Sequence, residues 1–125
     1  MNKNQALAAL LVALALAPLP AFADGDAANG AKLYPVKCGT CHALDANKIG
    51  PMQRGVIGRK AGIAVGYNYS PALKASGITW DEATVDKWLV NPSALVAGTK
   101  MSFRLPDPKD RADIIAYLKS VPAAK

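Results

Sequence analysis

The sequence predicts an all-α domain in which about four short helices are joined by long loops. Residues that cap helix N-termini recur along the chain, at Asp26, Ser70, Thr79 and Asp107. No convincing segment alternates apolar and polar residues as a half-buried strand does. Between the predicted helices, residues 45–66 and 91–106 carry glycine and proline and are predicted to be mostly loop.

The first 23 residues are organised like a secretory signal peptide. Lys3 precedes twelve consecutive Ala, Leu and Val residues, and Ala21-Phe22-Ala23 provides an A-x-A cleavage site. The apolar run is shorter than the roughly 20 residues that span a bilayer. An uncleaved anchor or a buried core helix is the alternative. We expect cleavage after Ala23, which leaves residues 24–125 as one mature domain.

The first two helices are predicted from their caps. Asp26 can start a helix that continues to about Val36. Ser70-Pro71 combines an N-cap with a proline in the first turn, and Gly77 is expected to end this short helix.

Two further helices follow. Thr79 and Glu82 have the spacing of a capping box and predict the start of the third helix, which ends before Asn91-Pro92. Its apolar face is formed by Val85, Trp88 and Leu89. Asp107-Pro108 starts the last helix. Residues there recur at helical spacing, as Arg111, Ile114, Ile115 and Leu118.

The loops are long for a small domain. The two irregular stretches have about 22 and 16 residues, and such loops are uncommon in a compact domain unless something orders them. Four short helices do not provide an obvious internal scaffold. A large bound group at the centre of the fold would solve this problem.

Both cysteines of the chain and its only histidine lie within five residues, as Cys38, Cys41 and His42. The pattern C-x-x-C-H is typical of c-type haem attachment. At a helix end, cysteines three residues apart project from one side and can reach both vinyl groups on one porphyrin edge. The next residue places an imidazole beneath the iron. We therefore expect one haem c, bound covalently through Cys38 and Cys41, with His42 as an iron ligand.

Three other chemistries remain open for this motif. A thioredoxin-like redox pair also uses C-x-x-C but needs a strand–helix–strand context, which the sequence does not indicate. Zinc or copper binding is disfavoured because ligands so nearly adjacent cannot easily surround one ion. A structural disulfide would leave His42 unexplained, and closing so short a loop would add little stability.

A methionine is the candidate for the sixth iron ligand. With no second histidine in the chain, the choice beyond the initiator is between Met52 and Met101. Met52 is only ten residues after His42 in a Gly-Pro loop, and we expect it at the haem periphery or in solvent. Met101 lies in the second long loop, which can wrap the far side of the porphyrin. The alternative for Met101 is a core side chain.

The charge favours acidic protein partners. The whole chain carries a formal charge of +6, and loss of Lys3 with the leader lowers it to +5. Positive charge speeds encounter with acidic surfaces, although it also serves solubility. Nucleic-acid binding is not expected, because the basic residues are scattered and match no binding motif.

These residues together resemble the class I cytochromes c, the small electron carriers of mitochondria and bacteria. The resemblance covers nearly all of residues 25–119. Its motifs are G-x-x-x-Y at 30–34, CGTCH at 38–42, IGP at 49–51, GRKAG at 58–62, YNYSPAL at 67–73, GITWDEAT at 77–84, NP at 91–92, GTKM at 98–101 and DRADIIAYLK at 110–119.

The resemblance implies further roles. The carbonyl of Pro51 would accept the second ring N–H of His42. Four positions would surround or hydrogen-bond the haem propionates, namely Arg59, Tyr69, Trp80 and Thr99. Gly30 and Tyr34 would cross Ile114 and Tyr117 where the first and last helices pack.

The chain also departs from the family's sequence pattern at several positions. Trp88 stands where many relatives have a tyrosine that bonds the methionine sulfur, so the sulfur either receives an indole N–H or lacks this bond. Arg54 occupies a place where a second histidine is common, and Leu73 replaces a polar residue. The stretch after Phe103 is short.

The expected function is one-electron transfer between redox proteins, with no enzymatic activity. Expected partners are an acidic donor and acceptor: an oxidase, reductase, dehydrogenase or reaction centre. Contact would be at the haem edge near Cys38 and Cys41, with rim charges at Lys37, Lys48, Lys100 and Arg104. We expect a periplasmic monomer without stable membrane insertion. The alternatives are a dedicated subunit of a periplasmic dehydrogenase, and a haem protein with an open iron site that acts on a small ligand.

Overall fold

The computed structural model describes residue 17 and residues 24–125, and the predicted signal peptide therefore lies almost wholly outside the described residues. In this described part of the chain, five helices follow one another: α1 (Ala27–Lys37), α2 (Pro71–Lys74), α3 (Glu82–Val90), α4 (Pro92–Leu95) and α5 (Pro108–Lys119). Loops join them, and the described residues form one isolated antiparallel bridge, between Lys60 and Thr79, but no strand. The all-α prediction is confirmed. Within this part of the chain, no helix has the length and apolar character needed to cross a membrane.

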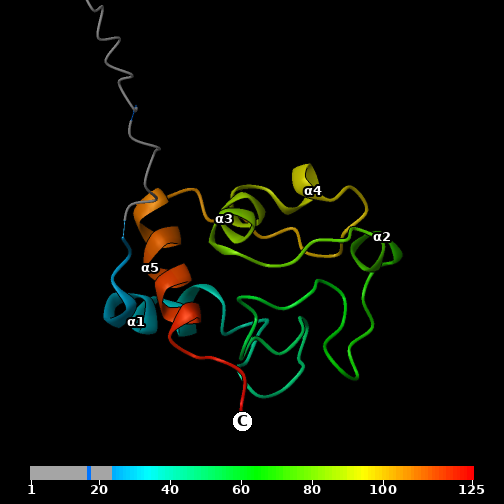
Figure 1. Cartoon of the computed structure of the whole chain (residues 1–125), viewed down its shortest axis with the longest axis horizontal. Helices are drawn as coiled ribbons and strands as arrows, with labels where there is room; N and C mark the ends of the chain where they lie inside the picture. The colour runs from blue at the N-terminus through cyan, green and yellow to red at the C-terminus, as the bar shows by residue number, and fades with distance from the viewer. Residues whose placement is uncertain (1–16, 18–23) are drawn as a thin grey trace, which may run out of the picture.

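Helices α1 and α5 pack side by side and form one side of the molecule, whereas the loops between Cys38 and Ser70 lie on another (Figure 1). Gly30 makes the close approach of the two helices possible. A Cβ atom on Gly30 would lie 2.0 Å from the carbonyl oxygen of Asp113 and 2.8 Å from Cβ of Tyr117. Near this crossing, the rings of Tyr34 and Tyr117 lie 5.4 Å apart. The predicted crossing is confirmed, and its tightest contact is with the backbone of Asp113.

Most predicted helix boundaries are confirmed, because the caps form as expected. Asp26 accepts hydrogen bonds from the backbone N–H groups of Ala28 and Asn29 at 2.9 and 3.1 Å. Asp107 likewise caps α5, and Ser70 caps α2 through the N–H of Leu73 at 3.1 Å.

Three local predictions were wrong. The N-cap of α3 is Asp81, which forms a capping box with Thr84, and not Thr79 with Glu82. Helix α2 ends at Lys74, before Gly77. The loop predicted over residues 91–106 contains the four-residue helix α4, for which Asn91 is the N-cap and Pro92 the first residue.

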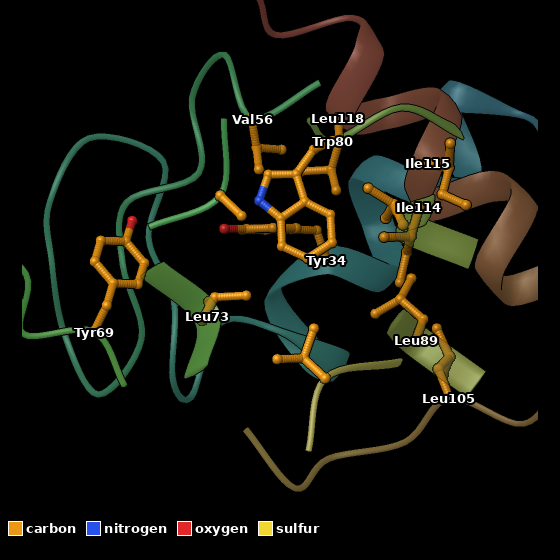
Figure 2. Close-up of a cluster of buried hydrophobic side chains, with 13 residues drawn as sticks. Tyr34, Val56, Tyr69, Leu73, Trp80, Leu89, Leu105, Ile114, Ile115 and Leu118 are labelled. Carbon is orange, nitrogen blue, oxygen red and sulfur yellow. The ribbon is translucent and has the colours of Figure 1, made fainter. Parts of the chain in front are cut away.

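The buried apolar side chains come from helices and loops alike (Figure 2). Helix α5 contributes the three apolar residues of its predicted stripe but not Arg111, and α3 contributes two of its three predicted residues. Trp80 and Tyr69, both on loops, are also buried. The buried set is Tyr34, Val56, Ala61, Tyr69, Leu73, Trp80, Val85, Leu89, Val96, Leu105, Ile114, Ile115 and Leu118. Loop residues are therefore as much a part of the core as helical ones.

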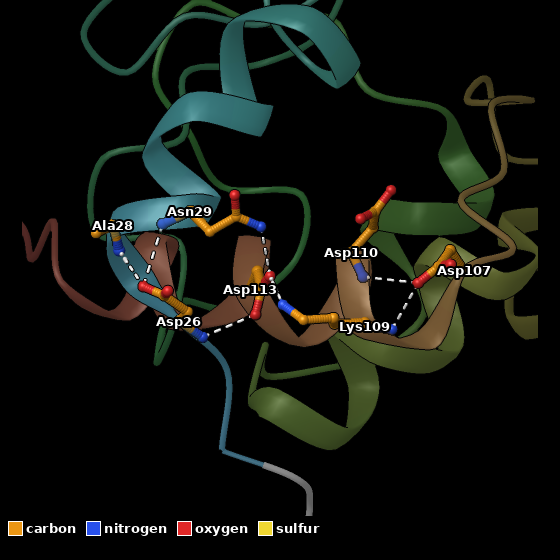
Figure 3. Close-up of polar contacts among 7 residues, drawn as sticks. All are labelled: Asp26, Ala28, Asn29, Asp107, Lys109, Asp110 and Asp113. Carbon is orange, nitrogen blue, oxygen red and sulfur yellow. Dashed lines mark hydrogen bonds and ion pairs between the residues drawn. The ribbon is translucent and has the colours of Figure 1, made fainter.

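A buried carboxylate fixes the start of α1 on α5 (Figure 3). Asp113 is 2% exposed, and it accepts hydrogen bonds from Lys109 Nζ at 2.6 Å, the Asp26 backbone N–H at 2.7 Å and Asn29 Nδ2 at 2.7 Å. These donors lower the pKa of Asp113 from 3.8 to about 2, and the hydrogen bond from Lys109 contributes most. All of them favour the ionised carboxylate.

We predict that Asp113→Asn destabilises the protein at neutral pH by about 2 kcal/mol, because buried hydrogen bonds to a charged acceptor are lost. The folded-state pKa of Asp113 lies below its unfolded value, so its contribution is complete above about pH 5 and is lost as pH falls toward 2. Denaturant unfolding from pH 7 to pH 2 should therefore show the difference between wild type and variant shrinking with acid. Asp110→Asn on the same helix is the control, and an equal loss there would contradict this role of Asp113.

Candidate functional site

The C-x-x-C-H segment directly continues α1. The N–H of Cys38 donates to the carbonyl of Tyr34 at 2.8 Å and closes the helix. The N–H groups of Cys41 and His42 then donate to the carbonyl of Cys38, at 3.1 and 2.8 Å. These bonds form one tight turn, on which all three side chains are half-buried. The two cysteines are not joined in a disulfide.

His42 is held from two sides by the loop that follows it. Its Nδ1 lies 2.9 Å from the carbonyl oxygen of Pro51, so Nδ1 carries the proton and donates it. The hydrogen bond expected between these residues is therefore present. Nε2 keeps its lone pair for a metal, and the bond fixes the ring orientation. Burial lowers the pKa of His42, with the charge of Lys48 adding to it and the Pro51 bond opposing it. The neutral imidazole that metals require is thus favoured.

Gly50 packs directly on the imidazole, a contact that the sequence did not indicate. Its N–H donates to the carbonyl of Cys41 at 2.8 Å, which brings the loop against the turn. A Cβ atom here would lie only 2.2 Å from Cε1 of His42 and 2.7 Å from Nε2. Only glycine leaves room for the ring in this position.

The cysteines lack the properties of a redox pair. Burial raises the pKa of Cys38 to about 11, and the negative charge of Cys41 acts in the same direction. A catalytic dithiol needs the opposite, a thiolate stabilised near neutral pH. The strand–helix–strand context of a thioredoxin-like site is also missing from the described residues. The same part of the chain has no group of three or more His, Cys, Asp or Glu side chains placed to hold a metal ion.

Met101 is oriented by a tryptophan. The indole Nε1–H of Trp88 donates to the sulfur of Met101 over 3.0 Å, which answers the question that the sequence left open. Trp88 in turn packs edge-to-face on Trp80, with centroids 5.1 Å apart. A thioether sulfur has two lone pairs, so one remains for a metal. Met101 also packs against the buried core.

Met52 lies elsewhere, on the loop beside His42. Its N–H donates to the side chain of Asn47 at 2.9 Å, and its carbonyl accepts from Arg59 Nη2 at 2.8 Å. Its backbone therefore helps to hold the loop that supports the imidazole.

The four residues expected at the propionates are only partly brought together. Arg59 and Trp80 are paired through their backbones, since the N–H of Trp80 donates to the carbonyl of Arg59 at 2.9 Å. Tyr69 is buried, and its hydroxyl accepts the N–H of Ala64 at 3.1 Å, which leaves its own proton to donate. Thr99 lies on the loop before Met101, and no hydrogen bond among the described residues links it to the other three.

The residues of this site fit a haem, and a buried nitrogen of Arg59 without a hydrogen-bond acceptor indicates this. Nε of Arg59 is buried and has no hydrogen-bond partner among the residues that the structure describes, although Nη1 and Nη2 both donate to backbone carbonyls. A buried guanidinium N–H without an acceptor is costly. A propionate would supply the acceptor that this atom lacks. The fit is completed by a neutral imidazole and two half-buried thiols.

Asn47 and Gln53, which the sequence analysis did not single out, hold the loops around the site. The amide of Asn47 accepts from Met52 and donates to the carbonyl of Val65 at 2.9 Å. Tyr34 donates its hydroxyl to the side chain of Gln53 at 2.6 Å, and burial raises the pKa of this phenol. Both contacts join segments distant in sequence, so no local pattern announces them.

We predict that Gly50→Ala displaces the imidazole of His42, because the added methyl group would overlap the ring. The yield of covalently attached haem, measured as pyridine haemochrome per mole of chain, should fall severalfold. Gly58→Ala is the control, because a Cβ there meets no atom within 4 Å and the change adds only the backbone strain of a φ of +92°. Equal yields from Gly50→Ala and the wild type would contradict the role given to Gly50.

Comparisons with known proteins agree with this geometry. The family model described as cytochrome c matches residues 27–122. Cytochrome c2 of Rhodomicrobium vannielii is 50% identical over 102 residues, which cover 78% of this chain and 81% of that protein. Cytochrome c of Tetrahymena pyriformis is 50% identical over 100 residues, covering 78% and 91%.

One solved structure is similar to this chain over nearly the whole length of the solved protein. Cytochrome cH from Methylobacterium extorquens superposes with a TM-score of 0.73 at 51% identity, and the match covers 77% of this chain and 99% of that one. This chain belongs to the cytochrome c family, and it is accordingly a haem electron carrier with covalently attached haem c.

Proposed function

We propose that this protein is an exported one-electron carrier whose haem iron is ligated by His42 and Met101. The observation that carries this proposal is that both candidate ligands are held by hydrogen bonds that leave a lone pair for the iron. His42 is fixed through Nδ1 by Pro51, and Met101 through its sulfur by Trp88. The two candidate ligands come from different segments, the turn after α1 and the loop after α4, so they could approach a bound haem from two sides.

Each part of the site has a role in this proposal. Haem c, when bound, supplies the Fe(III)/Fe(II) couple. Cys38 and Cys41 hold it through thioethers, and Arg59, Tyr69, Trp80 and Thr99 surround or hydrogen-bond its propionates. Trp80 packs on Trp88, whose indole holds the sulfur of Met101. Neutral thioether ligation and burial both favour the reduced iron and raise the reduction potential.

The surface supports acidic partners. Lys37, Lys48, Lys100 and Arg104 are all exposed, and they border the loops that carry the proposed ligands. They would steer a negatively charged donor and acceptor toward the haem edge. We propose that the partners are an oxidase, reductase, dehydrogenase or reaction centre in the periplasm. The carrier would be a monomer of residues 24–125, freed by cleavage after Ala23, with no enzymatic activity of its own.

Spectroelectrochemical titration of the purified holoprotein tests this function. We expect reversible one-electron behaviour, a far-red methionine-to-iron band in the oxidised form, and a reduced spectrum that carbon monoxide does not change. An immediate change with carbon monoxide would instead indicate an open iron site, and the carrier proposal would fail.

The same titration on Trp88→Phe tests how the methionine is held. The indole N–H withdraws electron density from the sulfur and so weakens its donation to Fe(III). Without it, the potential should fall by tens of millivolts, at most about 40 mV if one ordinary hydrogen bond of about 1 kcal/mol is lost. A potential equal to that of the wild type would show that this bond does not tune the iron.

A further inference from the structure

Tyr67 lies between the loop that supports His42 and the loop that carries Met101. Its hydroxyl donates to the carbonyl of Ile49 at 2.8 Å. Ile49 directly precedes Gly50, which packs on the imidazole of His42. Pro51, two residues after Ile49, accepts the hydrogen bond from Nδ1 of that imidazole. The phenol thus contacts the backbone of the segment that orients His42.

The other side of Tyr67 contacts the methionine loop. The ammonium group of Lys100 lies 5.8 Å from the centroid of the Tyr67 ring, within the range of a cation–π interaction. The same ammonium donates a hydrogen bond to the carbonyl of Asn68, the next residue along. Lys100 directly precedes Met101 in the chain. The residue that contacts Tyr67 is therefore the immediate neighbour of the residue that carries the sulfur.

Tyr67 is itself held in place. Its ring packs edge-to-face on the buried ring of Tyr69, with centroids 4.8 Å apart and an interplanar angle of 76°. On the same segment, the carbonyl of Val65 accepts from the side chain of Asn47. A half-buried aromatic ring with these contacts has few alternative positions, so it can transmit a restraint from one loop to the other.

We propose that Tyr67 and Lys100 form a link between the two ligand-bearing loops and that this link slows the release of Met101 from the iron. This Tyr67–Lys100 link rests on the proposed His42 and Met101 ligation. Both residues are positioning residues, since neither supplies an atom to the iron. Because the link joins the methionine loop to residues 47–52, any movement of that loop away from these residues as Met101 leaves would have to break the link.

The rate of imidazole binding to the ferric holoprotein measures how fast Met101 leaves the iron. Imidazole can occupy the iron only after Met101 leaves, so at high imidazole concentration the observed rate approaches the rate of methionine release. In stopped-flow mixing we expect Tyr67→Phe to raise this limiting rate about fivefold, the factor that corresponds to one ordinary hydrogen bond. Lys100→Gln should raise it similarly, and Lys100→Arg should restore a rate near that of the wild type.

A tyrosine outside the site provides the matched control. Tyr117 lies in the α1–α5 contact, so Tyr117→Phe removes a hydroxyl without touching the link. Its limiting rate should equal that of the wild type. Lys100 is exposed, so Lys100→Gln does not depend on core packing and keeps the test valid if Tyr67→Phe folds poorly. The resting variants should keep the far-red methionine band.

Two results would overturn the inference. Unchanged limiting rates in both Tyr67→Phe and Lys100→Gln, with the methionine band present, would remove the link but leave the proposed ligation standing. Immediate imidazole binding to a wild-type protein that lacks the methionine band would overturn the proposed ligation, and the link with it.

Discussion

The contact of Gly30 with the backbone of Asp113 is the constraint on which the rest of the structure depends. No side chain fits between α1 and α5 at this point, since a Cβ would lie 2.0 Å from a carbonyl oxygen. The buried carboxylate of Asp113 fixes the start of α1 on the same helix. Because the N-terminal part of α1 is held in this way, the position of Cys38 at its C-terminal end, and of the turn that follows, is fixed relative to α5.

The site is assembled from loops around that place. One loop brings Gly50 and Pro51 against His42, and another brings Met101 to the indole of Trp88. Neither loop has regular secondary structure to order it, so side-chain hydrogen bonds and buried aromatic rings take this role. Among the described residues, Nε of Arg59 is a buried side-chain nitrogen without a hydrogen-bond partner. The haem of this family is therefore a part of the core as well as a redox centre.

Local chemistry explains which features could be predicted from the sequence. Asp26 and Asp107 start helices because each side chain can reach N–H groups two and three residues ahead. The same chemistry misplaced the start of α3, since both Thr79 and Asp81 could serve as caps. In the structure, Asp81 forms the capping box with Thr84, and Thr79 pairs with Lys60 in the isolated bridge. Asn91-Pro92 was interpreted as the end of a helix but also starts α4. Gly50 contacts a ring eight residues before it, and Tyr67 joins two distant loops, and no local pattern predicts either contact.

The central claim is that this chain places Met101, and not Met52, on the iron opposite His42. The far-red absorption of the oxidised protein in Met101→Ala and Met52→Ala tests it most directly. We expect Met101→Ala to lose the methionine-to-iron band while retaining covalent haem, and Met52→Ala to keep the band. A band that survives in Met101→Ala, or disappears only in Met52→Ala, would show that Met101 is not the ligand.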